Sequence, residues 1–226
     1  MVEKCVFQEK ASFLQFVQQG LDINFMVCID FTGSNGDPRY PNSLHYANPN
    51  AFMQGQYNQY DSITAVIHRY EKAIYMIGNV IEFYDSDRMF PVYGFGACRQ
   101  NMSTTEHCFA LNDNEANPEV PGVQGIMNVY HSKLLELRFS GPTLFAPILA
   151  KAASCVLWRM LTSRIASVLQ RQRDKYLVML ILTDGAIHDM EDSIRQIVHS
   201  ARLPLSILIV GVGNDDFTNM EVEMGR

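Results

Sequence analysis

The hydrophobic residues of the chain gather in short unbroken runs, separated by longer amphipathic segments. The strongest runs are Ile23–Asp30, Tyr176–Asp184 and Leu205–Gly211. A strand that is covered by helices on both faces has this continuous apolar pattern, whereas a half-exposed strand alternates. We therefore expect these runs to be central parallel strands. Phe90–Gly94 is predicted as a weaker fourth strand, with Pro91 confined to its start.

Apolar residues at helical spacing mark the segments between these strands. The predicted helices are Ser62–Tyr84, Gly125–Leu137, Phe145–Gln172 and Asp189–Ala201. We place Trp158, on the third of them, in the core. The alternation of strands and helices predicts an α/β fold, with a doubly wound, mostly parallel central sheet flanked by helices on both faces. Irregular structure is expected at Gly33–Tyr60, Ala97–Pro121 and Asn214–Arg226.

Composition and charge narrow the class of protein. The length of 226 residues suits one large domain, and the net charge of −6 disfavours binding to a nucleic-acid backbone. The apolar runs are too short for a membrane span, which takes about 20 residues, and the first ten residues lack the apolar core of a signal peptide. The five cysteines share no metal-ligand spacing, which indicates reduced thiols. We expect a cytoplasmic protein.

Two of the predicted strands end in an aspartate that is followed by a tight turn. The first gives Asp30-Phe-Thr32-Gly-Ser34, and the second gives Thr183-Asp184-Gly185. In open parallel sheets, ligands bind outside the carboxyl ends of the strands. Two carboxylates at one edge would repel each other unless a cation lay between them. Carboxylate and hydroxyl oxygens, without His or Cys, indicate Mg²⁺, Mn²⁺ or Ca²⁺.

These residues also carry a resemblance to a known family. Asp30-x-Thr32-x-Ser34, with a distant Thr143 and Asp184, resembles the metal-ion-dependent adhesion site of von Willebrand factor A domains. The usual first motif there is Asp-x-Ser-x-Ser, and Thr32 keeps the hydroxyl. Longer passages resemble the A domain of copines from about Ser12 to Phe217. They are INFMVCIDFTGSNGDPRYPNSLHY, FYDSDRMFPVYGFGA, GPTLFAPIL, LILTDGAIHDM and LPLSILIVGVGNDDF.

The resemblance implies a role for each residue of the set. Asp30 would bind the metal partly through water, Thr32 and Ser34 directly, and Thr143 in one state of the site. Asp184 would orient a bound water. The remaining coordination position would take water or an acidic side chain of an intracellular partner protein, so that the domain docks partners and is not an enzyme.

The resemblance also implies a domain organisation. Residues 1–22 would be a linker, and residues 23–226 a von Willebrand factor A, or Rossmann-like, domain that stops before its last elements. Copines usually carry two calcium-sensing C2 domains ahead of this module. Membrane phospholipid would then be reached only through C2 domains that this chain lacks, with calcium-dependent recruitment of the full-length protein.

Two other functions are alternatives to the docking module. A metal-dependent phosphotransferase of the haloacid-dehalogenase type also begins with a strand ending in Asp, but it needs a second Asp as general acid where Thr32 stands. Phosphate-loop and nucleophile-elbow motifs are lacking in the sequence. A copine-like ubiquitin ligase would use the domain to dock its substrates, although this chain has no RING cysteines.

Several further candidates receive a structural interpretation. The loop Asn112–Asn117 lacks the Gly and Glu of an EF-hand and is interpreted as solvated. Asp85 and Asp87 are interpreted as members of an exposed turn. His188 either lines the rim of the metal site or, as we favour, simply begins a helix. The segment Tyr46–Tyr60 is equally well a contact surface or a covering loop.

Overall fold

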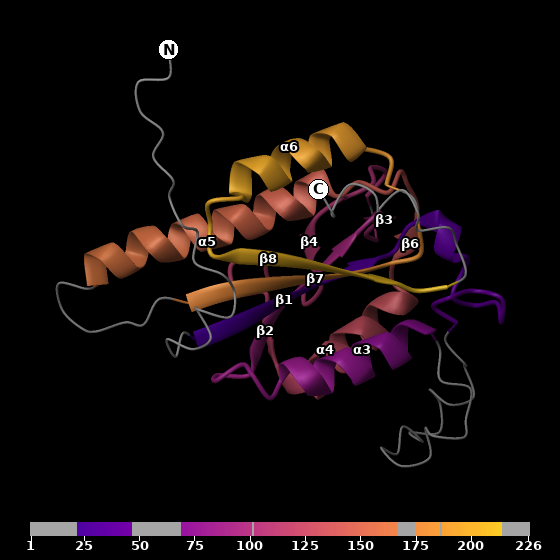
Figure 1. Ribbon diagram of the computed structural model, residues 1–226. Helices are drawn as coiled ribbons and strands as arrows, with labels where there is room; N and C mark the ends of the chain where they lie inside the picture. Colours follow the sequence, from indigo (N-terminus) through magenta and orange to yellow (C-terminus); the bar gives the residue numbers. More distant parts are fainter. Residues whose placement is uncertain (1–21, 47–68, 101, 167–174, 186, 214–226) are drawn as a thin grey trace.

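One mixed sheet, with helices on both of its faces, organises the protein. The computed structural model describes residues 22–46, 69–100, 102–166, 175–185 and 187–213. The central strands β1 (Asp22–Asp30), β2 (Met89–Phe95), β7 (Lys175–Thr183) and β8 (Leu205–Gly211) are parallel (Figure 1). Two short antiparallel strands, β4 (Phe109–Ala110) and β5 (Glu119–Pro121), pair with β2. Away from this sheet, β3 (Ala97–Cys98) pairs with β6 (Arg138–Phe139).

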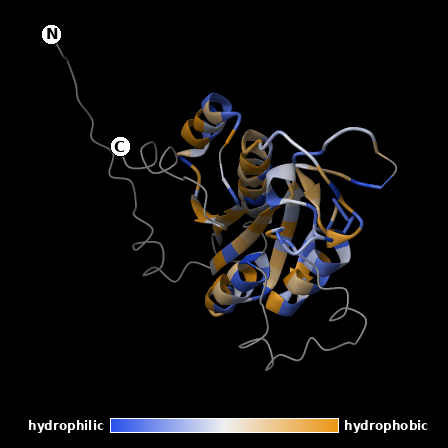
Figure 2. Ribbon diagram, turned by 90° about the vertical axis from the view of Figure 1, so that its right-hand side faces the viewer, coloured by the Kyte–Doolittle hydropathy of each residue, from blue (hydrophilic) through white to orange (hydrophobic). Residues whose placement is uncertain are grey.

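The helices divide the core into two layers. Helices α3 (Arg69–Ile81) and α4 (Gly122–Leu134) lie below the sheet in Figure 1, and α5 (Ala146–Ala166) and α6 (Met190–Ser200) lie above it. Each pair covers its own cluster of buried apolar residues. The central strands therefore carry apolar side chains on both faces. In Figure 2 much of the ribbon of these strands is coloured orange, for hydrophobic residues. This arrangement confirms the predicted doubly wound α/β fold.

The strand order places a binding edge beside β1. Along the main path the order is β4-β2-β1-β7-β8. From β1 the chain adds β2 on one side and later adds β7 and β8 on the other side, so the strand order reverses between β1 and β7. The crevice at such a reversal is where ligands bind in open α/β sheets. Ile29 pairs with Leu182, which brings the carboxyl ends of β1 and β7 side by side. The turn η1 (Gly33–Asn35) follows β1 at this edge.

The structure corrects three of the sequence predictions. The stretch Ala97–Pro121, expected to be irregular, contains β3, β4 and β5. Trp158 is 69% exposed and not in the core, because it lies on the face of α5 opposite the buried Leu149. Asp85, expected in an exposed turn, is buried. The loop Asn112–Asn117 is solvated, as expected, and is closed by its own hydrogen bonds.

Some predictions lie outside the described residues. These are the linker up to residue 21, residues 62–68 of the first predicted helix, residues 167–172 of the third, most of the segment Tyr46–Tyr60, and the end from residue 214. Within the described part of the chain, the helices are too short or too polar to cross a membrane.

Candidate metal centre

The five residues predicted for the metal site come together at the carboxyl edge of β1 and β7. Asp30, the last residue of β1, is buried, and its Oδ1 accepts hydrogen bonds from Thr32 N at 2.8 Å and from Thr32 Oγ1 at 2.6 Å. Thr32 Oγ1 lies 3.0 Å from Ser34 Oγ, which donates to Asp184 Oδ1 at 3.1 Å. Thr143 Oγ1 donates to Thr32 Oγ1 at 3.3 Å. Residues far apart in the sequence thus form one continuous hydrogen-bonded cluster.

The cluster is buried except at one corner. Asp30, Thr32, Thr143 and Asp184 are each 4% exposed or less. Ser34 is exposed, so its hydroxyl marks the side of the cluster that faces solvent. Among the five residues of the cluster, Ser34 is therefore the one that another molecule can approach from solvent.

The electrostatics of Asp30 match a cation site. Burial raises the pKa of the Asp30 carboxyl above its ordinary value, while hydrogen bonds from Thr183 and Thr32 lower it. Thr183 Oγ1 donates to Asp30 Oδ2 at 2.6 Å, so both carboxylate oxygens are engaged. A divalent cation beside this group would favour its charged form. The set of two carboxylates and three hydroxyls is the oxygen chemistry that Mg²⁺, Mn²⁺ and Ca²⁺ bind, so the residues present fit such an ion.

Backbone contacts fix the first turn. Gly33 N donates to Ser140 O, and Thr32 forms a parallel bridge with Ser140. Gly96, at φ +79°, packs against Thr32 so closely that an added Cβ would come 2.2 Å from Thr32 Cγ2. Only glycine fits both this conformation and this approach. The turn is therefore held from the β3–β6 side.

The other two loops are joined to each other. Thr143 N donates to His188 Nδ1 at 3.2 Å, and His188 N donates to Thr143 O at 2.9 Å. Asp189 then accepts hydrogen bonds from Phe145 N at 2.9 Å and Ala146 N at 2.8 Å, at the start of α5. His188 directly precedes the cap of α6, as we favoured, and it also contacts the backbone of the loop that carries Thr143. These contacts set the position of Thr143 relative to Asp184.

One residue beneath the turn was not predicted from the sequence. His45 is fully buried, and its Nε2 lies 2.8 Å from the backbone oxygen of Asp30. Its Nδ1 lies 2.8 Å from the hydroxyl of Tyr130 on α4. Burial lowers the pKa of His45 to about 3, so the ring is neutral at physiological pH. His45 stands in a stretch without periodicity, so no pattern in the sequence pointed to it.

The described residues contain no group of three or more His, Cys, Asp or Glu side chains suited to hold a metal. The cluster at Asp30 is of another kind, because only two of its members are acids and the rest are hydroxyls.

Known proteins with similar sequences allow the chain to be assigned to a family. The Copine family model matches residues 61–224, which include Thr143 and Asp184.

The chain belongs to the copine family.

Curated relatives extend the match over nearly the whole chain. Protein BONZAI 2 of Arabidopsis thaliana is 42% identical over 221 residues, covering 98% of this chain and 34% of that protein. Protein BONZAI 1 of the same plant is 46% identical over 211 residues, covering 93% and 32%. Copine-A of Dictyostelium discoideum is 39% identical over 222 residues, covering 98% and 33%. The chain thus spans about a third of the length of these copine relatives.

Among solved structures, the chain is similar to the manganese-loaded TRAP protein of Plasmodium vivax. The TM-score is 0.46 at 12% identity, covering 91% of this chain and 63% of that one. A likeness at this level supports no assignment of function. The fold of this copine domain rests on its own strands and helices, as described above.

Proposed function

We propose that this copine domain is a metal-dependent docking module and not an enzyme. The observation that carries the proposal is the convergence of five oxygen-bearing side chains into one cluster, of which Ser34 is exposed and the other four are buried. When bound, Mg²⁺, Mn²⁺ or Ca²⁺ would supply the positive charge that attracts a carboxylate of the partner. The partner class is then a protein that presents an exposed acidic side chain.

The buried and the exposed residues of the cluster would have different roles in binding. Asp30 and Asp184 supply negative charge from buried positions and balance the charge of the cation. Thr32, Ser34 and Thr143 supply hydroxyl oxygens between the two carboxylates, which keeps the local charge low enough for one more acid to bind. Ser34 lies at the exposed corner, where the partner's carboxylate would approach.

The setting of this docking is also part of the proposal. We place it in the cytoplasm, with partners that are intracellular proteins. Since the chain spans about a third of its relatives, membrane phospholipid would be bound by other parts of a longer copine. A ligase that docks its substrates through this domain would use the same cluster, so the two readings differ only in what surrounds it.

Isothermal titration with Mg²⁺, Mn²⁺ and Ca²⁺ tests the proposal. Ser34→Ala removes one hydroxyl from an exposed position, so the fold should persist while metal affinity falls by about tenfold or more. Ser154→Ala is the matched control, because Ser154 is an exposed serine of α5 whose hydroxyl donates to Ala150 O within the same helix. Equal affinities for wild type and Ser34→Ala would refute the assignment of the cluster.

The phosphotransferase alternative makes a different prediction. Thr32 occupies the position of the missing general acid, and its hydroxyl proton is donated to Asp30. A generic aryl phosphate with Mg²⁺ should therefore give no turnover. Metal-dependent turnover that is lost in Ser34→Ala would replace the docking proposal with the enzymatic one.

A further inference from the structure

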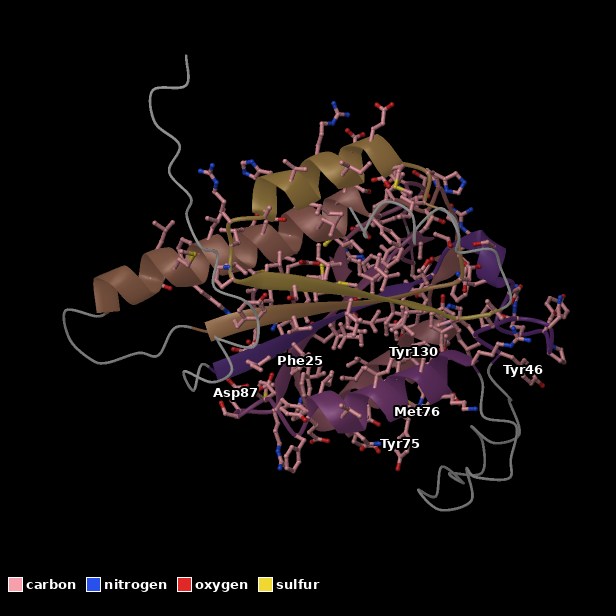
Figure 3. The ribbon with its side chains drawn as sticks, in the orientation of Figure 1. Phe25, Tyr46, Tyr75, Met76, Asp87 and Tyr130 are labelled. Carbon is pink, nitrogen blue, oxygen red and sulfur yellow. The ribbon has the colours of Figure 1, made fainter. Side chains whose placement is uncertain are left out.

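A buried histidine connects the metal turn to the helices on the lower face of the sheet. His45 lies between the backbone oxygen of Asp30 and the hydroxyl of Tyr130, at 2.8 Å from each. Tyr130 belongs to α4 and is buried between the sheet and the helices (Figure 3). The imidazole is therefore a direct link between the end of β1 and α4.

The two contacts determine the tautomer of the ring. A backbone carbonyl oxygen can only accept a hydrogen bond, so Nε2 must carry the proton and donate to Asp30. In the neutral ring Nδ1 is then an acceptor, and the Tyr130 hydroxyl donates to it. Both ring nitrogens are satisfied in this one arrangement. It fixes the direction of both hydrogen bonds, from the Tyr130 hydroxyl to His45 and from His45 to the Asp30 carbonyl.

Aromatic packing prevents the ring from leaving this position. His45 stacks on Tyr70 of α3 with ring centroids 3.8 Å apart, and on Phe31 at 5.2 Å. Phe139 of β6 meets it edge-on at 5.0 Å. The ring is thus enclosed by Tyr70 of α3, Tyr130 of α4 and Phe139 of β6, and by Phe31, the neighbour of Asp30.

We propose that His45 is a positioning residue for the metal centre, which holds the Asp30 carbonyl in place and ties it to α4 through Tyr130. This role rests on the metal-dependent function proposed above. The new element is that metal affinity depends on the hydrogen bond between His45 and the Asp30 carbonyl. This bond does not involve the metal and lies on the face of the sheet covered by α3 and α4. Removing the Nε2 donor loosens the turn that presents Asp30, Thr32 and Ser34.

Two substitutions of His45 separate positioning from general stability. In His45→Gln the side-chain amide nitrogen reaches the place of Nε2 and can still donate to Asp30, whereas in His45→Asn it reaches only the place of Nδ1. We expect His45→Asn to weaken Mg²⁺ binding by about tenfold, and His45→Gln to stay near the wild-type affinity. His199→Asn, at an exposed position of α6, is the control. Equal affinity of His45→Asn and wild type, or equally weak binding by both variants, would overturn the proposal.

Tyr130→Phe keeps the test decisive if His45→Asn does not fold. It removes only the hydroxyl, so the ring stays enclosed while Nδ1 loses its donor. We expect the ¹⁵N signal of His45 Nδ1 to shift and Mg²⁺ affinity to fall. An unchanged signal and an unchanged affinity would contradict the link.

Failure of the docking proposal gives a separate result. If wild type itself binds no metal, the metal-free NMR spectrum still decides the role of His45. The amide signals of Thr32 and Ser34 should then move in His45→Asn and return in His45→Gln. If they fail to move, the positioning role is refuted on its own.

Discussion

A buried carboxylate lies at the end of the sheet opposite the cluster at Asp30. Asp85 is 3% exposed; its Oδ2 accepts a hydrogen bond from Phe25 N at 3.2 Å, and its Oδ1 accepts one from Arg88 N at 3.1 Å. Figure 3 shows Phe25 and Asp87 at this end. Burial, together with the neighbouring acid Asp87, raises the pKa of Asp85 to about 6. The residue joins the start of β1 to the turn before β2.

This raised pKa makes stability depend on pH. The folded protein holds the Asp85 proton more tightly than the unfolded chain does, where the pKa is about 3.9. The free energy of unfolding should therefore fall as pH rises from about 4 to about 6, and its dependence on Asp85 should level off above that. Urea denaturation across this range should show a shallower fall in Asp85→Asn than in wild type. The exposed Asp192→Asn serves as control, and identical pH profiles for Asp85→Asn and wild type would contradict this account.

The residues of the site differ in how far the sequence could foretell them. Asp30 and Asp184 were predictable, because each ends an apolar strand and parallel strands bring such ends to one edge. Thr143 came from the family resemblance alone. His45 could not be foretold, since its role depends on Tyr130, 85 residues later in the chain. The placement of Trp158 in the core was wrong, because this residue lies half a turn around the helix from the buried Leu149.

At the scale of the elements, the sequence predicts the central strands well and the short strands poorly. β1, β7 and β8 were predicted nearly to the residue, because burial on both faces leaves an unbroken apolar run in the sequence. β3 and β6 are two residues each and pair with each other, while Ala97 of β3 also bridges to Glu106. Ser140, which follows β6, supports the metal turn through this pairing. No local pattern indicates such a contact.

Helix α5 begins at a cap supplied by a distant loop. Asp189 accepts hydrogen bonds from Phe145 N and Ala146 N, which belong to the group of N–H donors that a helix start leaves unpaired. A carboxylate there also meets the positive end of the helix dipole. The same aspartate follows His188, which binds the backbone of Thr143. The cap of α5 and the placement of Thr143 are therefore one structural feature.

Asp189→Ala should affect both properties. The free energy of unfolding without metal should fall by about 1 kcal/mol, the usual cost of removing a cap. Mg²⁺ affinity should fall as well, because Thr143 is no longer held against His188. Urea denaturation and calorimetric titration measure the two effects. Glu191→Ala, in the exposed first turn of α6, is the control, and a stability loss with unchanged affinity would separate the cap from the site.

On the scale of the whole molecule, the metal cluster joins segments that the sheet alone leaves separate. The turn after β1, the loop before α5 and the turn after β7 meet there through hydroxyl and carboxylate contacts, which add to the backbone contacts of Ser140 and His188. The turn after β1 is tied by His45 to α4 below the sheet, and Asp189 ties the other two to α5 above it. An ion bound here would therefore hold both helical layers to one point of the sheet edge.

Metal binding should consequently stabilise the domain as a unit. A ligand that binds only the folded state adds about 2.7 kcal/mol to the free energy of unfolding when its free concentration is about 100 times its Kd. For a domain of this size, each kcal/mol raises Tm by about 2–4 °C, so saturation should raise Tm by about 5–10 °C. Thermal unfolding with Mg²⁺, Mn²⁺, Ca²⁺ or chelator measures this, and the ion with the largest shift at equal concentration is the preferred one. Ser34→Ala should match wild type in chelator and show a smaller shift with every ion, because its buried neighbours remain in place. A Tm that rises equally in Ser34→Ala and wild type would locate the stabilising ion away from the Asp30 cluster.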